Sequence, residues 1–187
     1  MRLNVLIAAC LFGLAAPAFA DDPIEDKAQA CMACHGENGM PADVKVPVIW
    51  GQHAGYLYIQ LKDYKAKRRT HELMDPIVAE LEKADMLALA TYFEAKEWPR
   101  TGYATPEDDE TKGEQIAVAG MCTSCHLGSF LGDSAIARVA GQTQPYLERQ
   151  LLDFKHKVRN NNPDKSNLMK TFSDDDLKLM SRYLAGR

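Results

Sequence analysis

Apolar residues recur with helical spacing in two stretches of this 187-residue chain. In the first stretch they are Tyr56, Leu57, Ile59, Leu61 and Tyr64, with Gln60 among them. In the second they are Tyr146, Leu147, Leu151 and Phe154, with Gln150 among them. The spacing predicts helices over residues 56–64 and 146–154. Because no segment alternates convincingly with a period of two residues, we predict an all-α fold with little or no sheet.

Two more helix starts are marked by residues that suit a helix N-terminus. The sequence "SDDD" places Ser173 at the N-cap and Asp176 near the third helical position, where the two can bond each other's backbone. Asp174 and Asp175 add negative charge at the positive end of the helix dipole. Pro23, with acidic neighbours, predicts the start of an earlier helix that runs toward Cys31.

The chain contains an internal repeat. The segment "GQHAGYLYIQLKDYKAK" from Gly51 matches "GQTQPYLERQLLDFKHK" from Gly141 at an offset of 90 residues. Near the end of each half, four further positions correspond at an offset of 91: Asp85, Met86, Leu89 and Tyr92 with Asp176, Leu177, Met180 and Tyr183. Agreement over separated segments indicates two copies of one fold.

The repeat divides the chain into two units with a linker between them. The intervening "WPRTGYATPEDDETK" holds two prolines, a glycine and an acidic cluster, as connecting segments often do. We expect a first domain over residues 21–98, a linker over 99–111 and a second domain over 112–187. Apolar burial alone leaves units of roughly 75 to 80 residues marginally stable, and a bound prosthetic group would enlarge the core.

The N-terminus predicts export. Arg2 precedes an apolar run of about a dozen residues that closes on Ala18-Phe19-Ala20, the pattern of a signal peptide over residues 1–20. The alternative is a membrane anchor, but a bilayer core needs roughly 20 apolar residues and this run is shorter. We expect cleavage after Ala20 and a periplasmic protein.

Charge narrows the choice of partners. Without Arg2 the chain keeps 21 basic residues against 26 acidic ones. A mildly acidic exported protein is a poor candidate for binding nucleic acid, which needs a basic face. No later segment is apolar enough to span a membrane, and peripheral association with membrane complexes stays open.

The sequences "CMACH" and "CTSCH" carry the chemistry of the two units. They place Cys31, Cys34 and His35 in one unit and Cys122, Cys125 and His126 in the other, 91 residues apart. Cysteines at i and i+3 share a helix face, with the histidine beside the second. This arrangement lets two sulfurs bond the vinyl groups of a haem while the imidazole reaches its iron. We therefore predict two covalently bound haem c groups.

Three alternatives explain the cysteines less well. A zinc site built from two such pairs usually separates them by roughly 15 to 20 residues. A thioredoxin-like redox pair needs a βαβ context, which is absent from the pattern. A plain disulfide gives no reason for a histidine to follow both pairs. With Cys10 lost in the leader, every remaining cysteine belongs to a motif.

Each iron then needs a second axial ligand, and methionine sulfur is common in electron carriers. We predict Met74 and Met169, which lie in polar segments 39 and 43 residues after the two histidines, where we expect loops. Met86 and Met180 fit the apolar face of the last helices as core residues. His71 is the competing ligand, while His53 and His156 fit surface or helix-start positions.

The cysteine motifs, the paired "GQ" helices and the methionine segments resemble cytochrome c4, a dihaem class I c-type cytochrome. The resemblance implies two tandem cytochrome c-like helical domains, each around one covalently attached haem, with haem propionates facing the interface. In this family a proline carbonyl holds the proximal histidine. Pro47 fits that role, whereas Ala137 stands at the second place, and Leu127 replaces the glycine that follows the first motif. We expect the two haems to differ in potential.

The leading hypothesis is therefore a periplasmic electron carrier without catalytic residues. The resemblance implies redox protein partners: a dehydrogenase or quinol-oxidising complex as donor and a terminal oxidase as acceptor. A second hypothesis makes the chain the haem electron-acceptor subunit of a dehydrogenase complex, acting on sulfur compounds or through a flavoprotein. A third is a dihaem enzyme of the peroxidase or thiosulfate dehydrogenase type.

Overall fold

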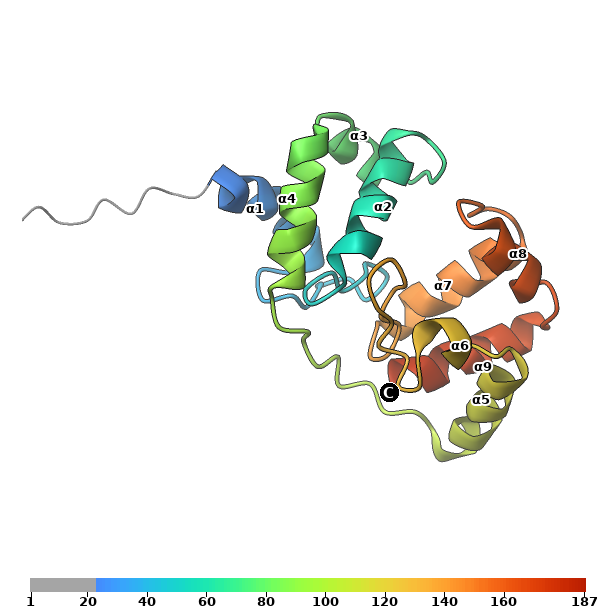
Figure 1. The fold of residues 1–187 in the computed structure, drawn as a ribbon. Helices are drawn as coiled ribbons and strands as arrows, with labels where there is room; N and C mark the ends of the chain where they lie inside the picture. Colours follow the sequence, from blue (N-terminus) through green and yellow to red (C-terminus); the bar gives the residue numbers. More distant parts are fainter. Residues whose placement is uncertain (1–22) are drawn as a thin grey trace, which may run out of the picture.

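The computed structural model describes residues 23–187, which form two helical units lying side by side (Figure 1). The first unit is built from α1 (Pro23–His35), α2 (Ala54–Lys65), α3 (Met74–Ala79) and α4 (Lys83–Glu94). The second is built from α5 (Glu107–Ala119), α6 (Thr123–His126), α7 (Gln144–Lys155), α8 (Pro163–Met169) and α9 (Asp174–Ala185). No strand forms within residues 23–187, so the all-α prediction is confirmed.

The predicted helix starts are confirmed in detail. Pro23 opens α1. At the start of α9, Ser173 Oγ accepts a hydrogen bond from the backbone of Asp176 at 3.0 Å, and the Asp176 carboxylate accepts one from the backbone of Ser173 at 3.0 Å. Glu82 and Asp85 form the same box at the start of α4. The two units therefore begin their last helices with the same device.

The connection between the units is shorter than predicted. Helix α5 begins at Glu107, so residues 107–111 of the expected linker are helical. Four acidic residues fill the first turn of α5, where they offset the helix dipole. The remaining linker passes along one edge of both units (Figure 1). The predicted signal peptide, residues 1–20, lies outside the described residues.

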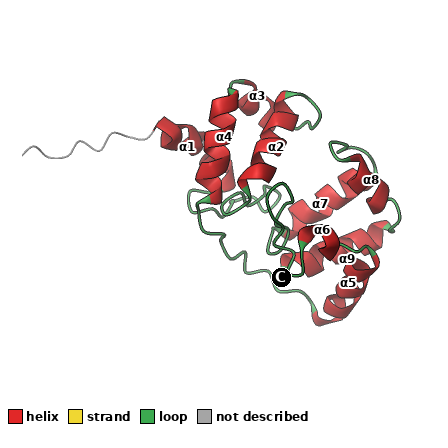
Figure 2. Ribbon diagram, in the orientation of Figure 1, coloured by secondary structure: helices red, strands yellow, loops and turns green. Residues whose placement is uncertain are grey.

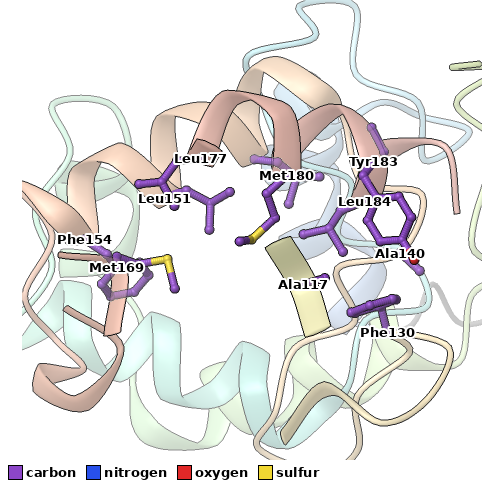
Figure 3. Close-up of a cluster of buried hydrophobic side chains, with 12 residues drawn as sticks. Ala117, Phe130, Ala140, Leu151, Phe154, Met169, Leu177, Met180, Tyr183 and Leu184 are labelled. Carbon is purple, nitrogen blue, oxygen red and sulfur yellow. The ribbon is translucent and has the colours of Figure 1, made fainter. Parts of the chain in front are cut away.

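Each unit packs its middle helix against its last helix. In the first unit α2 and α1 both contact α4, and in the second α7 and α5 both contact α9. Met86 and Met180 are 5% and 1% exposed, as expected for core residues. In the second unit the core runs from Met169 and Phe154 at one end to Tyr183 and Phe130 at the other (Figure 3).

Loops meet between the two units (Figure 2), and two glutamines join them there. The Gln52 side chain donates to the carbonyl of Arg138 at 2.9 Å and accepts from its N–H at 2.8 Å. Gln142 does the same to Val48, at 2.9 and 2.8 Å. Both glutamines are 3% exposed. The glutamine of each "GQ" pair therefore serves the interface.

A second layer of the interface contains two buried arginines. Arg69 donates to Gln60 and Gln150, both at 2.9 Å, and Arg159 donates to the same two side chains at 2.7 Å. Each guanidinium also reaches a tyrosine hydroxyl of the other unit, namely Tyr146 for Arg69 and Tyr56 for Arg159. The arginines are 9% and 8% exposed. The contact between the units is thus polar and positively charged.

Candidate functional site

The first motif lies on the last turns of α1. Cys31 is partly buried and packs against the core cluster that includes Ala28 and Leu89, while Cys34 is exposed. His35 ends the helix and is 7% exposed. Neither cysteine is in a disulfide. The two thiols and the imidazole are therefore all available to one group bound against this helix end.

The second motif repeats this arrangement on an interrupted helix. Helix α5 ends at Ala119, Met121 takes a positive φ of 49°, and Cys122 precedes the single turn of α6. Cys122 is partly buried and Cys125 is exposed, as in the first unit, and neither is in a disulfide. The spacing of the three side chains survives although the helix behind them is broken.

Backbone carbonyls hold both histidines. His35 Nδ1 lies 2.7 Å from the carbonyl oxygen of Pro47, and His126 Nδ1 lies 2.8 Å from that of Ala137. When Nδ1 carries the proton and donates to the carbonyl, the lone pair of Nε2 points away and can bind a metal. The carbonyl of Ala137 therefore supplies the same contact as that of Pro47.

The surroundings of both imidazoles favour the neutral form. Burial lowers the pKa of His35, and the hydrogen bond to Pro47 opposes this only in part. For His126, burial and then the positive charge of Lys165 lower the pKa to about 4. A neutral imidazole is the form that binds metal ions.

The turn that follows each motif has a similar backbone geometry in the two units but different residues. Gly36 has a φ of +92°, and a β-carbon there would lie 2.1 Å from the carbonyl oxygen of Met40. Leu127 takes the corresponding place with a φ of +62°. The next turn bond is also shared: Gly39 N–H donates to Gly36 at 3.1 Å and Phe130 N–H donates to Leu127 at 3.0 Å. The second unit therefore holds non-glycine residues in left-handed conformations.

The two predicted methionine ligands lie in short helices, so the expectation of loops was wrong. Met74 begins α3 and is partly buried, packing on the cluster of Tyr64, Val78 and Met86. Met169 ends α8 and is 3% exposed. It lies beside Phe154 in the core of the second unit (Figure 3). Their environments differ, and their roles as ligands stay predictions.

The other histidines have structural partners. His71 Nδ1 accepts a hydrogen bond from the N–H of Leu73 at 3.3 Å. His53 is the N-cap residue of α2, and its Nε2 lies 2.8 Å from the Leu131 carbonyl of the second unit. His156 is the C-cap residue of α7. Each of the three therefore has a role in the fold.

The donor set in each unit fits a covalently attached haem. In each unit two cysteines in the i, i+3 relation are followed by a histidine. The Nδ1 of that histidine is held by a backbone carbonyl, which leaves Nε2 for a metal. Such a hydrogen bond fixes the ring orientation and raises the basicity of the ligating nitrogen. The residues present therefore suit the haem that the sequence predicts.

Known proteins support this interpretation. No protein-family model matches the chain. Cytochrome c4 of Pseudomonas aeruginosa is 30% identical over 198 residues, covering 100% of this chain and 98% of that protein. The chain belongs to the cytochrome c4 family. The crystal structure of reduced recombinant cytochrome c4 from Pseudomonas stutzeri superposes with a TM-score of 0.78, at 26% identity, over 89% of this chain and 99% of that one.

A second kind of relative has a more specific name. The "thiosulfate dehydrogenase electron acceptor" of Stutzerimonas stutzeri is 31% identical over 170 residues, which cover 84% of this chain and 79% of that protein. As a cytochrome c4, the chain is a dihaem electron-transfer cytochrome with two covalent haem c groups and two cytochrome c-like domains. These conclusions confirm the predicted fold, cofactors and general function.

Sequence reasoning missed the residues that join the units. Gln52 and Gln142 were visible as part of the repeat, but nothing in the pattern showed that they bond the opposite unit. Arg69 and Arg159 also correspond at an offset of 90 residues, and this correspondence was a signal in the sequence that could have identified them. Arginine at matching places in two copies of a unit is a usable signal for a contact between the copies.

Proposed function

We propose that the two motifs hold the two haems of this cytochrome. Cys31 and Cys34 form the thioethers in the first unit, with His35 as proximal ligand. Cys122, Cys125 and His126 serve the second unit in the same way. The observation that carries the assignment is the pair of carbonyl contacts at 2.7 and 2.8 Å, which leave one nitrogen of each imidazole available for iron.

Met74 is our proposed second ligand of the first iron. Its helix follows α2 and lies in contact with it, which brings the thioether into the same unit as His35. For the second iron the sequence predicts Met169. Two axial ligands close an iron to small molecules and suit electron transfer.

When bound, each haem supplies a one-electron iron centre, and the chain determines its surroundings. The apolar cores exclude water, and the carbonyls fix the histidines. Arg69 and Arg159 place positive charge at the interface, where buried charge is costly without a partner. Haem propionates, which the resemblance places at this interface, are suitable anionic partners for these arginines.

We infer that the mature protein works in the periplasm after cleavage following Ala20. None of the helices within residues 23–187 is long and apolar enough to cross a membrane. Redox proteins are its partners: a dehydrogenase or quinol-oxidising complex gives electrons, and a terminal oxidase or similar acceptor takes them. Sequencing the N-terminus of the periplasmic protein checks the export step, and a retained leader would contradict it.

A second candidate role is that of haem acceptor for a dehydrogenase acting on a sulfur compound. The similarity to the thiosulfate dehydrogenase electron acceptor of Stutzerimonas stutzeri favours it over other complexes. In this role the chain still carries electrons and performs no catalysis itself. Rapid reduction by a thiosulfate dehydrogenase, with no thiosulfate oxidation by the cytochrome alone, supports this candidate.

Attachment is tested by mass spectrometry of the denatured protein. We expect the mature chain to retain two haems, and Cys31→Ala/Cys34→Ala and Cys122→Ala/Cys125→Ala variants to retain one each. The matched control is Ser124→Ala, which changes the second motif but keeps both of its cysteines. Retention of both haems in either double variant would refute the assignment.

A further inference from the structure

The hydrogen bonds of the two units give a more exact correspondence than the sequence does. The bond from Asp75 N–H to the His71 carbonyl corresponds to that from Ser166 N–H to Asn162, at 2.9 and 3.0 Å. Asp75 and Ser166 stand 91 residues apart, as do His71 and Asn162. The N-cap residues of α4 and α9 show the same offset. The second unit therefore has one extra residue before α8, and not the five suggested by pairing Met74 with Met169.

This register pairs Met169 with Val78. Leu81 N–H donates to the Val78 carbonyl and Phe172 N–H donates to that of Met169, at 3.1 and 3.3 Å. Val78 and Met169 are 0% and 3% exposed. Each lies in a cluster with an aromatic residue of the middle helix and a residue of the last helix: Tyr64 and Met86 for Val78, Phe154 and Leu177 for Met169. Met169 thus takes the place of a packing residue.

The same register places Lys165 where the first unit has Met74. Lys165 lies in α8, and its Nζ is 5.2 Å from the centre of the Phe154 ring. Within residues 23–187, this ammonium has no hydrogen-bond acceptor or ion-pair partner. A partly buried amine without a carboxylate is costly in a folded protein unless another group uses it.

The amine of Lys165 is also electrostatically close to the second haem motif. Its positive charge contributes to the low pKa of His126 and opposes the rise that burial causes in the pKa of Cys122. Cys125 interacts with it as well. Burial in turn lowers the pKa of Lys165 to about 8. Lys165 therefore lies in the same unit as this motif, on the helix that corresponds to the one carrying Met74.

We propose that Lys165 nitrogen, and not Met169 sulfur, is the second axial ligand of the iron in the second unit. The inference rests on the proposed attachment of a haem to Cys122, Cys125 and His126. A neutral amine donates a nitrogen lone pair, which is harder than thioether sulfur and favours ferric iron. The second haem then has a lower potential than the first, whose ligand is Met74.

The test uses the intact diheme protein and variants of each candidate ligand. Ferric haem bound by methionine sulfur has a weak absorption band in the red, so the band counts methionine-ligated irons. The variants are Lys165→Met, Lys165→Ala and Met169→Leu, with the exposed Lys170→Ala as the matched charge control. Mass spectrometry first confirms two haems in each, which separates failure of attachment from failure of this inference.

We expect the parent to show the band of one methionine-ligated iron. Lys165→Met should double its amplitude and raise the lower potential, and Lys165→Ala should let one ferrous haem bind carbon monoxide. Met169→Leu, which keeps the core volume, and Lys170→Ala should change none of these readings. The proposal fails if the parent shows the band of two methionine-ligated irons and Met169→Leu removes half of it. It also fails if Lys165→Ala leaves the spectrum, the potentials and carbon monoxide binding unchanged.

Discussion

The two units of this cytochrome agree on the proximal side of their proposed haems and differ on the other. Both fix a histidine with a backbone carbonyl, at 2.7 and 2.8 Å, although one carbonyl belongs to Pro47 and the other to Ala137. For the second axial ligand, we propose Met74 in one unit and Lys165 in the other. A backbone contact survives substitution because any residue provides a carbonyl, whereas a side-chain ligand changes with a single residue.

The largest expected effect comes from making the first unit like the second. Met74→Lys should remove the methionine band of the first iron and lower its potential, because the ferrous state loses its soft ligand. With Lys165 on the second iron, no methionine band should remain in this variant. Optical spectra and a redox titration measure both changes. Persistence of the full parental band would show that Met74 ligates neither iron.

An intermediate effect is expected at the interface, where the units are alike. Gln52→Ala and Gln142→Ala should each lower the free energy of unfolding by about 2 to 4 kcal/mol, because each leaves a buried N–H and carbonyl without partners. Denaturant titration of the holoprotein measures the change. Gln144→Ala, which removes contacts inside the second unit only, is the control. A loss of less than half a kcal/mol, on the order of a surface change, would show that these bonds are not needed.

The smallest effect is expected at the turn after the motifs. Leu127→Gly should raise the free energy of unfolding by about 1 kcal/mol, because glycine takes the φ of +62° without the cost that other residues meet. Gly36→Ala in the other unit should lower it, since the new β-carbon meets the Met40 carbonyl. Thermal unfolding of both variants checks the opposite signs. Destabilisation by Leu127→Gly would mean that the leucine side chain contributes more than its strain.

Sequence alone predicted the parts of the molecule that depend on local rules. The middle helices followed from apolar spacing, and Ser173 and Asp176 formed the capping box that their order indicates. The cysteine motifs predicted covalent haem because their spacing is set by the group itself. Both cores also contain the methionines expected there, Met86 and Met180.

The remaining features depend on contacts between distant residues. A single inserted residue before α8 shifts the register, and the sequence alone offers Met169 as a match for Met74 because both are methionines. Hydrogen bonds in α3 and α8 show that Lys165 holds that place. The glutamine pairs across the interface join residues 86 and 94 positions apart, which no local pattern encodes. The position of Lys165 and the glutamine bonds across the interface therefore both depend on tertiary structure and not on local sequence.

The two glutamines also determine how one unit would behave if it were produced without the other. Val48 directly follows Pro47, and Arg138 directly follows Ala137. Each glutamine therefore hydrogen-bonds the segment of the opposite unit whose carbonyl holds that unit's histidine. A single unit produced alone would expose this segment and one of the arginines to water. Two halves produced as separate chains, divided between Pro99 and Pro106, keep every one of these contacts. Such a split protein should reassemble without its linker, and its halves should depend on each other for a properly held histidine.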